Sequence, residues 1–486
     1  QVDQRTGLSE EELIGIIGEY DGLMIRSGTQ VTAAVIAAAS RLKIIGRAGV
    51  GVDNVDVPAA TQRGVLVVNS PEGNTIAAAE HALAMMLTLS RHIPQAHGGM
   101  RAGKWDRKKY VGNELYKKTL GVVGLGKIGS HVARVAQAMG MEVIAYDPFI
   151  AADRAQRMQV KLLELDELFR TADYVTLHIP RTKDTENLVN AELLRTMKPT
   201  ARIVNCARGG VVDEAAIAEA INNGVIAGAG LDVYASEPLA EDSPLRAVER
   251  GLVLTPHLGA STEEAQENVA IDVAEQIRDV LLGLPARSAV NIPGLSAEIM
   301  ERLKPHLQLA ETVGLLVSQL AGGHVKEMEL RLQGEFASHP SQPLVIAALK
   351  GLLSAGLGDS INFVNASLEA KARGIQVLEV KDESSRDFAG GSLQITTRGD
   401  QGSRSVTGAV FADGDLRITS IDAFPVNVTP SSHMLFTRHR DMPGIIGHLG
   451  SLLGEHNVNI ASMQVGRKIV RGDAVMVLSI DDPIPA

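Results

Sequence analysis

The stretch Lys118–Pro148, KTLGVVGLGKIGSHVARVAQAMGMEVIAYDP, decides the fold class of the first half of the chain. An apolar β-branched run leads into three glycines, Gly124, Gly126 and Gly129, in the spacing G-x-G-x-x-G, and a helical pattern follows. A second apolar run ends at Asp147, about 20 residues after the last glycine. Strand, glycine loop, helix, strand and acid in this order indicate a dinucleotide-binding βαβ unit.

Each glycine of this loop has its own physical reason. Gly124 allows a tight turn, Gly126 lets backbone N–H groups approach a pyrophosphate, and Gly129 lets the following helix pack closely on the strand. That helix is expected from His131 to Met139. Asp147 would accept a hydrogen bond from a ribose 2′-hydroxyl and repel a 2′-phosphate, so the pattern favours NAD over NADP. The alternative is a structural strand-turn-helix that binds no nucleotide.

Composition restricts the classes of partner. The 486 residues carry a net charge of −10, which gives no basic surface for nucleic acid or an anionic membrane and favours a small-molecule partner. The single cysteine, Cys206, excludes an intrachain disulfide framework and is typical of a reducing compartment, so a cytoplasmic location is expected. The apolar stretch Thr75–Pro94 contains Glu80 and His81 and predicts a buried helix rather than a membrane span.

The apolar pattern changes along the chain. From Asp21 to about Pro256, short Val, Ile and Leu runs alternate with helical patterns, which predicts two parallel sheets in α/β units. After Val290 a strand over Lys326–Gln333, an apolar helix over Leu344–Leu357 and polar turns over Asp382–Gly402 predict an α+β domain. From His433 the pattern predicts a strand, a helix and two further strands.

Three chemically suitable side chains follow predicted strands beyond the glycine loop. Arg208, Glu237 and His257 lie in the segments NCARGG, LDVYASEP and PHLGAS. Loops at the carboxyl ends of neighbouring parallel strands converge on the ligand crevice, so we expect these residues to meet. A histidine can move a hydroxyl proton, a carboxylate can orient it, and an arginine can bind a substrate carboxylate. An ordinary surface ion pair and a structural histidine are the alternatives.

These residues, together with IRSGTQVT, GRAGVGVDNVD and NSPEGNT, resemble the D-isomer-specific 2-hydroxyacid dehydrogenases, in particular their long, four-domain branch. The resemblance implies oxidation of 3-phospho-D-glycerate to 3-phosphohydroxypyruvate by hydride transfer to NAD, the first step of L-serine biosynthesis. It implies that His257 moves the C2-hydroxyl proton, that Glu237 is its partner, and that Arg208 binds the carboxylate. It implies no metal. Cys206 is expected to be a packed core thiol rather than a nucleophile.

The resemblance also implies the remaining site residues. Cofactor contacts are expected at Gly124, Gly126, Lys127, Ile128, Gly129, Asp147, Pro148, His178, Cys206, Ala207, Asp232 and Gly259. Substrate contacts are expected at Arg26, Ser27, Arg47, Gly49 and Asn74. The two arginines follow strands of the first sheet and suit a substrate that carries both a carboxylate and a phosphate.

By the same resemblance, a substrate-binding domain comprises residues 1–70 and 257–290, and a Rossmann-type NAD domain at 71–256 is inserted in it. An intervening regulatory domain would cover 291–428 and a ferredoxin-like ACT domain 429–486. Pairing of the helix Thr75–Arg91 with its copy implies a homodimer or homotetramer. The chain begins without methionine, so a clipped N-terminus is expected. The last module lacks a helix and a strand, so either that end is truncated or the module is incomplete.

The C-terminal segment FTRHRDMPGIIGHL resembles an ACT domain, which binds an amino acid between two copies. The resemblance implies L-serine as effector, bound by His439, Asp441 and Asn459. A packing or dimerisation module without ligand is the alternative, because the module is incomplete.

Two other functions remain open at this stage. One keeps the chemistry but uses glyoxylate or hydroxypyruvate, and Arg26, Arg47 and the two C-terminal domains argue against it. The other is a non-enzymatic NAD-sensing scaffold like the C-terminal-binding corepressors, and the regulatory tail argues against that.

Overall fold

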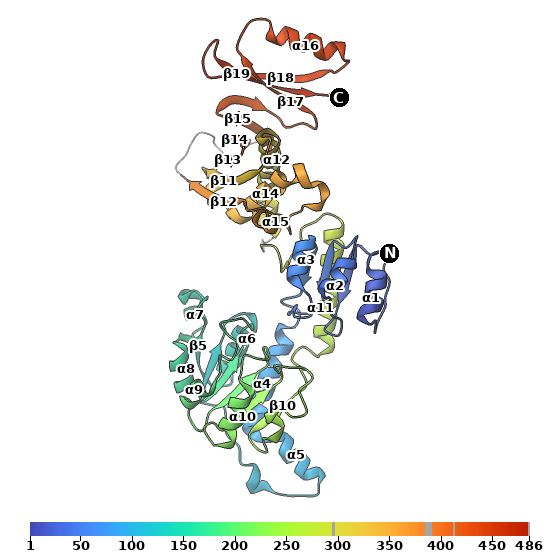
Figure 1. Ribbon diagram of the computed structural model, residues 1–486. Coiled ribbons are helices and arrows are strands. Elements are labelled where there is room, and N and C mark those ends of the chain that lie inside the picture. Colours follow the sequence, from blue (N-terminus) through green and yellow to red (C-terminus); the bar gives the residue numbers. More distant parts are fainter. Residues whose placement is uncertain (294–296, 384–390, 412–413, 485–486) are drawn as a thin grey trace. The chain divides into compact units, whose positions relative to one another are not determined.

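The computed structural model describes residues 1–293, 297–383, 391–411 and 414–484, and they form two compact units (Figure 1). One unit comprises Gln1–Arg47, Val52–Asn69 and Glu275–Ala486. The other comprises Ala48–Gly51 and Ser70–Ala274. Along the chain, the second unit is thus inserted in the first.

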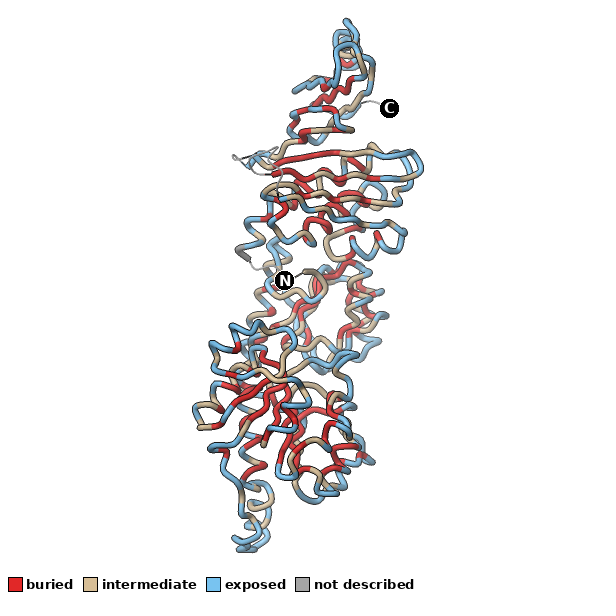
Figure 2. Tube along the Cα trace, turned by 90° about the vertical axis from the view of Figure 1, so that its left-hand side faces the viewer, coloured by how far each residue is buried: buried red, intermediate tan, exposed pale blue. Residues whose placement is uncertain are grey.

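A seven-stranded sheet forms the centre of the inserted unit, with the strand order β10-β9-β8-β7-β4-β5-β6 and every pair parallel. Most of its strands are buried, as the tube in Figure 2 shows. The strand order reverses between β4 and β7, and ligands of doubly wound sheets bind at the carboxyl ends beside such a reversal. The strands are β4 Thr119–Val123, β5 Glu142–Tyr146, β6 Lys161–Leu162, β7 Tyr174–Leu177, β8 Arg202–Asn205, β9 Gly228–Leu231 and β10 Leu252–Leu254.

Helices connect these strands, as a parallel sheet requires. The longest within the unit is α4, Thr75–Arg91, which confirms the predicted buried helix. The others are α5 Ile93–Arg101, α6 Lys127–Ala138, α7 Ala152–Arg157, α8 Leu165–Thr171, α9 Ala191–Arg195 and α10 Glu214–Asn222, with 3-10 turns η1 Arg107–Tyr110 and η2 Pro244–Ala247. The helix α11, Glu263–Leu281, begins in this unit and ends in the other.

In the inserted unit, two details differ from the sequence prediction. The helix after the glycine loop begins at Lys127, not His131, because its first turn is polar and contains Gly129, so the apolar periodicity starts one turn late. The strand β6 was not predicted, since it consists of two residues that pair only with Ile144 and Ala145.

The N-terminal part of the other unit contains a three-stranded parallel sheet in the order β1-β2-β3. Its strands are β1 Gly22–Ile25, β2 Ile44–Arg47 and β3 Leu66–Asn69, and its helices are α1 Glu10–Ile17, α2 Ala33–Ala38 and α3 Val57–Arg63. Ile25 pairs with Arg47, and Arg47 pairs with Asn69, so the residues that follow β1 and β2 lie at one edge of this sheet.

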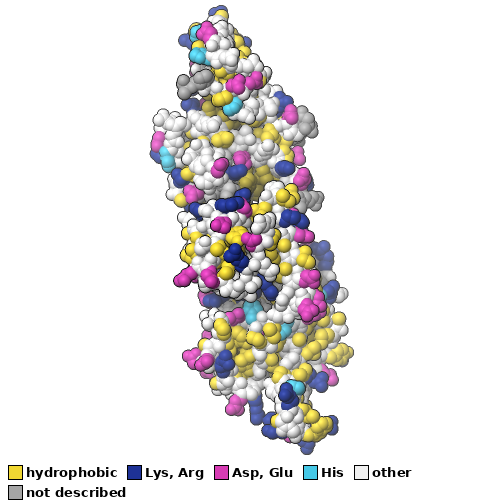
Figure 3. Space-filling model, turned by 90° about the vertical axis from the view of Figure 1, so that its right-hand side faces the viewer, with side chains coloured by type: hydrophobic (Ala, Val, Ile, Leu, Met, Phe, Trp, Pro, Cys, Tyr) yellow, Lys and Arg dark blue, Asp and Glu magenta, His cyan; other side chains and the backbone are white. Residues whose placement is uncertain are grey.

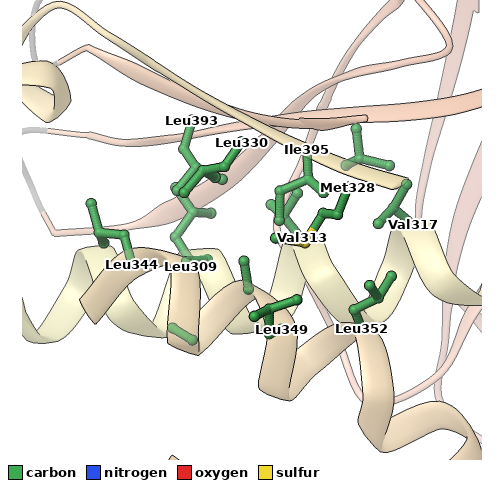
Figure 4. Packing of buried hydrophobic residues seen from close by; sticks show 14 of the residues in the cluster. Leu309, Val313, Val317, Met328, Leu330, Leu344, Leu349, Leu352, Leu393 and Ile395 are labelled. Atoms are coloured by element: carbon green, nitrogen blue, oxygen red, sulfur yellow. The ribbon is translucent and has the colours of Figure 1, made fainter. Parts of the chain in front are cut away.

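A six-stranded sheet in the order β12-β11-β13-β14-β15-β16 forms the next part, which is α+β as predicted. Leu309, Val313 and Val317 of α12 pack between this sheet and α14 (Figure 4). The elements are α12 Ala297–Ala321, β11 Val325–Gln333, α13 Glu335–Ser338, α14 Ser341–Leu357, η3 Gly358–Ser360, α15 Ala366–Ala372, β12 Gln376–Asp382, β13 Ser392–Gly399, β14 Gly402–Val410, β15 Leu416–Ile421 and β16 Phe424–Val428.

The prediction of polar turns over Asp382–Gly402 is wrong in its second half. Residues 384–390 lie outside the described part of the chain, but Ser392–Gly399 is the central strand β13. Leu393, Ile395 and Thr397 face the core, and the residues between them are polar. That alternation was obscured by the surrounding glycines and serines.

The last described part contains a three-stranded antiparallel sheet in the order β17-β19-β18 with one helix. Its elements are β17 Met434–Arg440, α16 Ile445–Glu455, β18 Ile460–Arg467 and β19 Asp473–Ile480. They confirm the predicted order of strand, helix, strand and strand.

Basic and acidic side chains are interspersed on the face that Figure 3 shows, which agrees with the composition. In the described part of the chain, every helix is too short or too polar to cross a bilayer.

Candidate active site

The glycine loop between β4 and α6 leaves open space at one position and is tightly packed at two. Gly124 has φ +95°, and a Cβ there would lie 2.5 Å from the carbonyl oxygen of His178. A Cβ at Gly129 would lie 2.0 Å from the carbonyl oxygen of Gly124. At Gly126, the N-cap of α6, a Cβ would meet no described atom within 4 Å. A helix N-terminus under open space fits a phosphate group.

Asp147 follows β5 with both carboxylate oxygens already oriented by the backbone. Its Oδ2 accepts a hydrogen bond from the N–H of Leu125 at 2.8 Å, and its Oδ1 accepts one from Phe149 at 2.9 Å. The side chain is therefore fixed beside the loop, with lone pairs left for a ribose hydroxyl. Three further predicted cofactor contacts lie in or near the same loop. Lys127 forms an ion pair with Glu72. Ile128 is partly buried against the core, and Pro148 is exposed.

His257 and Glu237 form an ionisable pair at the carboxyl edge of the sheet. Nδ1 of His257 lies 2.7 Å from Oε2 of Glu237, and Oε1 of Glu237 accepts a hydrogen bond from the N–H of Tyr234 at 3.1 Å. Glu237 is thus held by the backbone and in turn holds the imidazole. Nε2 is the ring nitrogen left for a substrate, and 51% of the His257 side chain is exposed.

Arg208 stands on a turn that Asn205 fixes. Asn205 is the buried last residue of β8; its Oδ1 accepts from the N–H of Ala207 and its Nδ2 donates to the carbonyl of Arg208, both at 3.0 Å. Nη1 of Arg208 donates to the carbonyl of Ala207 at 2.7 Å. A guanidinium has five N–H donors in a fork that matches the geometry of a carboxylate.

Burial keeps two neighbouring titratable groups neutral. It raises the pKa of the Cys206 thiol far above its ordinary value, and the charge of Asp232 acts in the same direction. Burial lowers the pKa of His178 to about 4, and its Nε2 lies 3.0 Å from Oγ1 of Thr176. At neutral pH the thiol is therefore no nucleophile and the imidazole carries no charge.

Asp232, which follows β9 and is fully buried, lies where β8, β9 and β10 end. Its oxygens accept hydrogen bonds from the N–H groups of Leu258 at 2.7 Å and Gly259 at 2.8 Å. Among the described residues, one group of three could supply metal ligands, namely His81, Cys206 and Asp232, whose polar atoms lie within 4.8 Å. Because the carboxylate already accepts several hydrogen bonds, we interpret this group as a hydrogen-bonded network.

The predicted substrate residues occupy both units. Arg26 and Ser27 follow β1 and are exposed, and Arg47 ends β2, so the arginines lie at one edge of the first sheet. In the inserted unit, Gly49 has φ +147° and its carbonyl accepts from the N–H of Ser70 at 2.9 Å. Asn74 is the N-cap of α4, and its buried Oδ1 has no hydrogen-bond partner among the described residues.

Comparison with known proteins decides the family. The profile of the D-isomer specific 2-hydroxyacid dehydrogenase NAD binding domain matches residues 83–259, that of the D-3-phosphoglycerate dehydrogenase intervening domain 302–422, and that of the ACT domain 433–486. The D-3-phosphoglycerate dehydrogenase of Synechocystis sp. is 64% identical over 486 residues, which are 100% of this chain and 87% of the relative. That of Archaeoglobus fulgidus is 44% identical over 99% of this chain and 92% of the relative.

The chain belongs to the D-3-phosphoglycerate dehydrogenase family. The crystal structure of the TT0316 protein from Thermus thermophilus aligns with 60% of this chain and 92% of its own, with a TM-score of 0.55 and 35% identity. The protein is therefore an oxidoreductase that uses NAD, as the glycine loop and Asp147 predict.

The effector residues that the family resemblance implies are separated within one chain. His439 pairs with Ala474 of β19, while Asn459 directly precedes Ile460, which pairs with Ile480 at the other end of β19. Six residues of strand span roughly 20 Å. Asp441 lies with His439, and its carboxylate accepts a hydrogen bond from Arg467 at 2.7 Å, which lowers its pKa. Asn459 donates to Asp481 at 2.7 Å.

Sequence reasoning missed three residues that hold the candidate site by hydrogen bonds: His81, Asn205 and Thr255. Asn205 directly precedes the segment CARGG, so its place at a strand end was a usable signal. His81 lies on α4 and gave no such signal, because its partners follow β9 and β10, far along the chain.

Proposed function

We propose that the chain oxidises 3-phospho-D-glycerate to 3-phosphohydroxypyruvate with NAD, and that the Glu237–His257 pair supplies the base. The single observation that carries the assignment of residues is this 2.7 Å pair, in a unit that also contains the open loop at Gly126. The relatives' name supports the substrate.

The proposed NAD contacts follow from the loop. The N-terminus of α6 at Gly126 would bind the pyrophosphate, with Gly124 and Gly129 allowing the close approach, and Asp147 would bind the ribose hydroxyls. When bound, NAD supplies the hydride acceptor. The remaining proposed contacts are Lys127, Ile128, Pro148, His178, Cys206, Ala207, Asp232 and Gly259.

His257 then removes the C2-hydroxyl proton through Nε2, since Nδ1 faces Glu237. The carboxylate of Glu237 fixes the ring orientation and stabilises the imidazolium that forms. Arg208 would bind the substrate carboxylate with its guanidinium and polarise the carbonyl that develops at C2. In the reverse direction His257 returns the proton.

We assign the binding of the substrate phosphate, and further polar contacts to the substrate, to the five predicted substrate residues. Arg26 and Arg47 supply positive charge, and Ser27, Gly49 and Asn74 supply hydrogen-bonding groups. The buried, unpaired Oδ1 of Asn74 supports this role, because such an atom in a native protein awaits a ligand or water.

The test is steady-state NAD reduction with 3-phospho-D-glycerate and with D-glycerate. Wild type should prefer the phosphorylated acid, and Arg26→Ala or Arg47→Ala should weaken that preference by roughly 10–100-fold, the effect of one charge-assisted contact. Arg63→Ala, an exposed arginine at the end of α3, is the matched control. Equal rates on both acids would contradict the substrate assignment, and full activity of His257→Ala would contradict the base.

Regulation, assembly and compartment belong to the same proposal. We propose that L-serine binds His439 and Asp441 of one chain and Asn459 of another, because these residues occupy opposite ends of one sheet. The chain would then act as a homodimer or homotetramer. A cytoplasmic location accords with its single cysteine.

A further inference from the structure

A buried hydrogen-bond network lies directly behind the turn that carries His257. Asp232 is its centre. One oxygen of this carboxylate, Oδ1, accepts from Oγ1 of Thr255 at 2.6 Å and from the N–H of Leu258 at 2.7 Å, and Oδ2 accepts from Gly259 at 2.8 Å. The backbone carbonyl of Asp232 accepts from the N–H of His257 at 2.9 Å. Asp232 therefore forms hydrogen bonds with residues of the turn that precede His257, with His257 itself and with the residues that follow it.

This turn requires such support because of its backbone conformation. His257 has φ +55°, in the left-handed region that side chains with a Cβ rarely adopt. The conformation costs on the order of 1–2 kcal/mol and persists only where neighbouring contacts determine it. The position of the His257 ring thus depends on the position of the Asp232 carboxylate.

The carboxylate also stays ionised in its buried site. Burial by itself would raise its pKa, but the hydrogen bonds from His81, Thr255, Leu258 and Gly259 outweigh burial and lower the pKa below the ordinary value. An anion accepts stronger hydrogen bonds than a neutral acid, so ionisation strengthens its hold on the turn.

His81 joins this network from α4. Its Nε2 lies 3.2 Å from Oδ1 of Asp232 and 3.3 Å from Oγ1 of Thr255. The Thr255 hydroxyl already donates its proton to Asp232, and an ionised carboxylate can only accept hydrogen bonds. Nε2 of His81 must therefore carry a proton and act as the donor in this contact. The His81 side chain is 20% exposed, so packing against the unit restricts its movement.

We propose that His81 is a positioning residue for the reaction. Its hydrogen bond holds the Asp232 carboxylate in the orientation that binds residues 255–259, and through that turn it holds Nε2 of His257 at the substrate hydroxyl. This inference rests on the proposed role of His257 as the base. It assigns to α4 a direct part in catalytic geometry, in addition to packing.

The test compares His81→Leu, which removes the donor, with His81→Gln, which places an amide donor near the position of Nε2. For His81→Leu we expect kcat to fall by on the order of 10–100-fold, the effect of a misplaced catalytic group, with the KM for 3-phospho-D-glycerate changed by less than about threefold. His81→Gln should recover most of kcat. The readouts are kcat, both KM values and the melting temperature.

Ser90→Ala is the matched control on the same helix. Ser90 is buried and hydrogen-bonded to the Tyr174 hydroxyl at 2.8 Å and to the carbonyl of Met86 at 2.7 Å, so its loss should lower the melting temperature and leave kcat unchanged. If His81→Leu gives this same pattern, His81 is only structural and the proposal is overturned. Failure of His81→Gln to recover kcat above His81→Leu would also overturn it.

Two further variants keep the outcome decisive. If His81→Leu does not fold, Thr255→Val removes the other side-chain donor to Oδ1 and should lower kcat in the same way; unchanged kcat would refute the network's role. His257→Ala tests the underlying assignment separately. Its full activity would refute the base, whereas an inactive His257→Ala together with a fully active His81→Leu would refute only the positioning role.

Discussion

The open space at Gly126 allows a ligand to approach the N-terminus of α6. A Cβ there would meet no described atom within 4 Å, whereas at Gly129 it would lie 2.0 Å from a backbone oxygen. We therefore expect Gly126→Ala to leave the melting temperature unchanged but to raise the KM for NAD about tenfold or more, a loss of about 1.4 kcal/mol. Gly129→Ala should lower the melting temperature as well. An unchanged KM for NAD in a folded Gly126→Ala would argue against cofactor binding over this loop.

A single carboxylate ties three segments of the inserted unit together. Asp173, just before β7, accepts hydrogen bonds at 2.9 Å from the N–H of Thr119 and from Lys198. Burial acts to raise its pKa, but these two donors lower it below 3.8. Since the pKa is depressed on folding, the stabilisation is complete above pH 3.8 and is lost as pH falls through the lower, folded value.

Asp173→Asn should accordingly lower the free energy of unfolding by about 1–3 kcal/mol at pH 7. The melting temperatures of variant and wild type can be measured by calorimetry as a function of pH. Their difference should be constant from pH 5 to pH 8 and should disappear only below pH 3.8. The exposed ion pair Asp153–Arg157 provides the control. Asp153→Asn should lower the free energy of unfolding by less than about 0.5 kcal/mol, because exposed ion pairs contribute little. A difference between wild type and Asp173→Asn that grows on acidification would contradict the sign of this pKa shift.

At the scale of elements, α12 and α14 approach so closely that glycines are required. A Cβ on Gly351 of α14 would lie 1.9 Å from the carbonyl oxygen of Glu311, and one on Gly314 of α12 would lie 2.3 Å from that of Ala348. Gly351→Ala should separate the helices and destabilise this part by about 1–3 kcal/mol. A Cβ on Gly356, later in α14, would meet no described atom within 4 Å. Gly356→Ala should therefore leave the stability of the fold unchanged or raise it by about 0.5–1 kcal/mol. Urea unfolding followed by circular dichroism measures the free energy of unfolding of both variants. Equal values for Gly351→Ala and Gly356→Ala would refute the close packing of the two helices.

The elements that sequence reasoning recovered are those whose pattern is local. Runs such as Leu120–Val123 and Val143–Ala145 are apolar throughout because both faces of a parallel sheet are covered, and they were predicted as strands. The strand β13 was missed because its outer residues are polar and only one face is buried. A two-residue strand such as β6 depends on its neighbour rather than on its own sequence.

The same distinction applies to the site. His257 and Glu237 could be proposed together because each follows a strand, and carboxyl ends of parallel strands share an edge. The contact of His81 with Asp232 could not, because it depends on how α4 packs across the ends of β9 and β10. Tertiary packing, rather than local periodicity, creates that contact.

At the scale of the whole molecule, the proposed effector residues lie too far apart within one chain to contact the same serine molecule. His439 and Asp441 lie at the end of β17, and Asn459 lies at the opposite end of the sheet, before β18. If serine inhibits through these residues, each site must combine both halves from two chains. Regulation would then require assembly, whereas the Glu237–His257 pair belongs to a single chain.

Mixed assemblies test this requirement directly. We expect His439→Ala and Asn459→Ala each to abolish serine inhibition in homo-oligomers, since every site then lacks one half. Co-expression of the two variants, purified through two different tags, produces some interfaces with both residues intact, so part of the inhibition should return. Co-expression of two differently tagged His439→Ala chains is the control and should stay insensitive. A mixed assembly that remains insensitive, or single variants that keep wild-type inhibition in a serine titration, would show that the effector does not bind across these two ends.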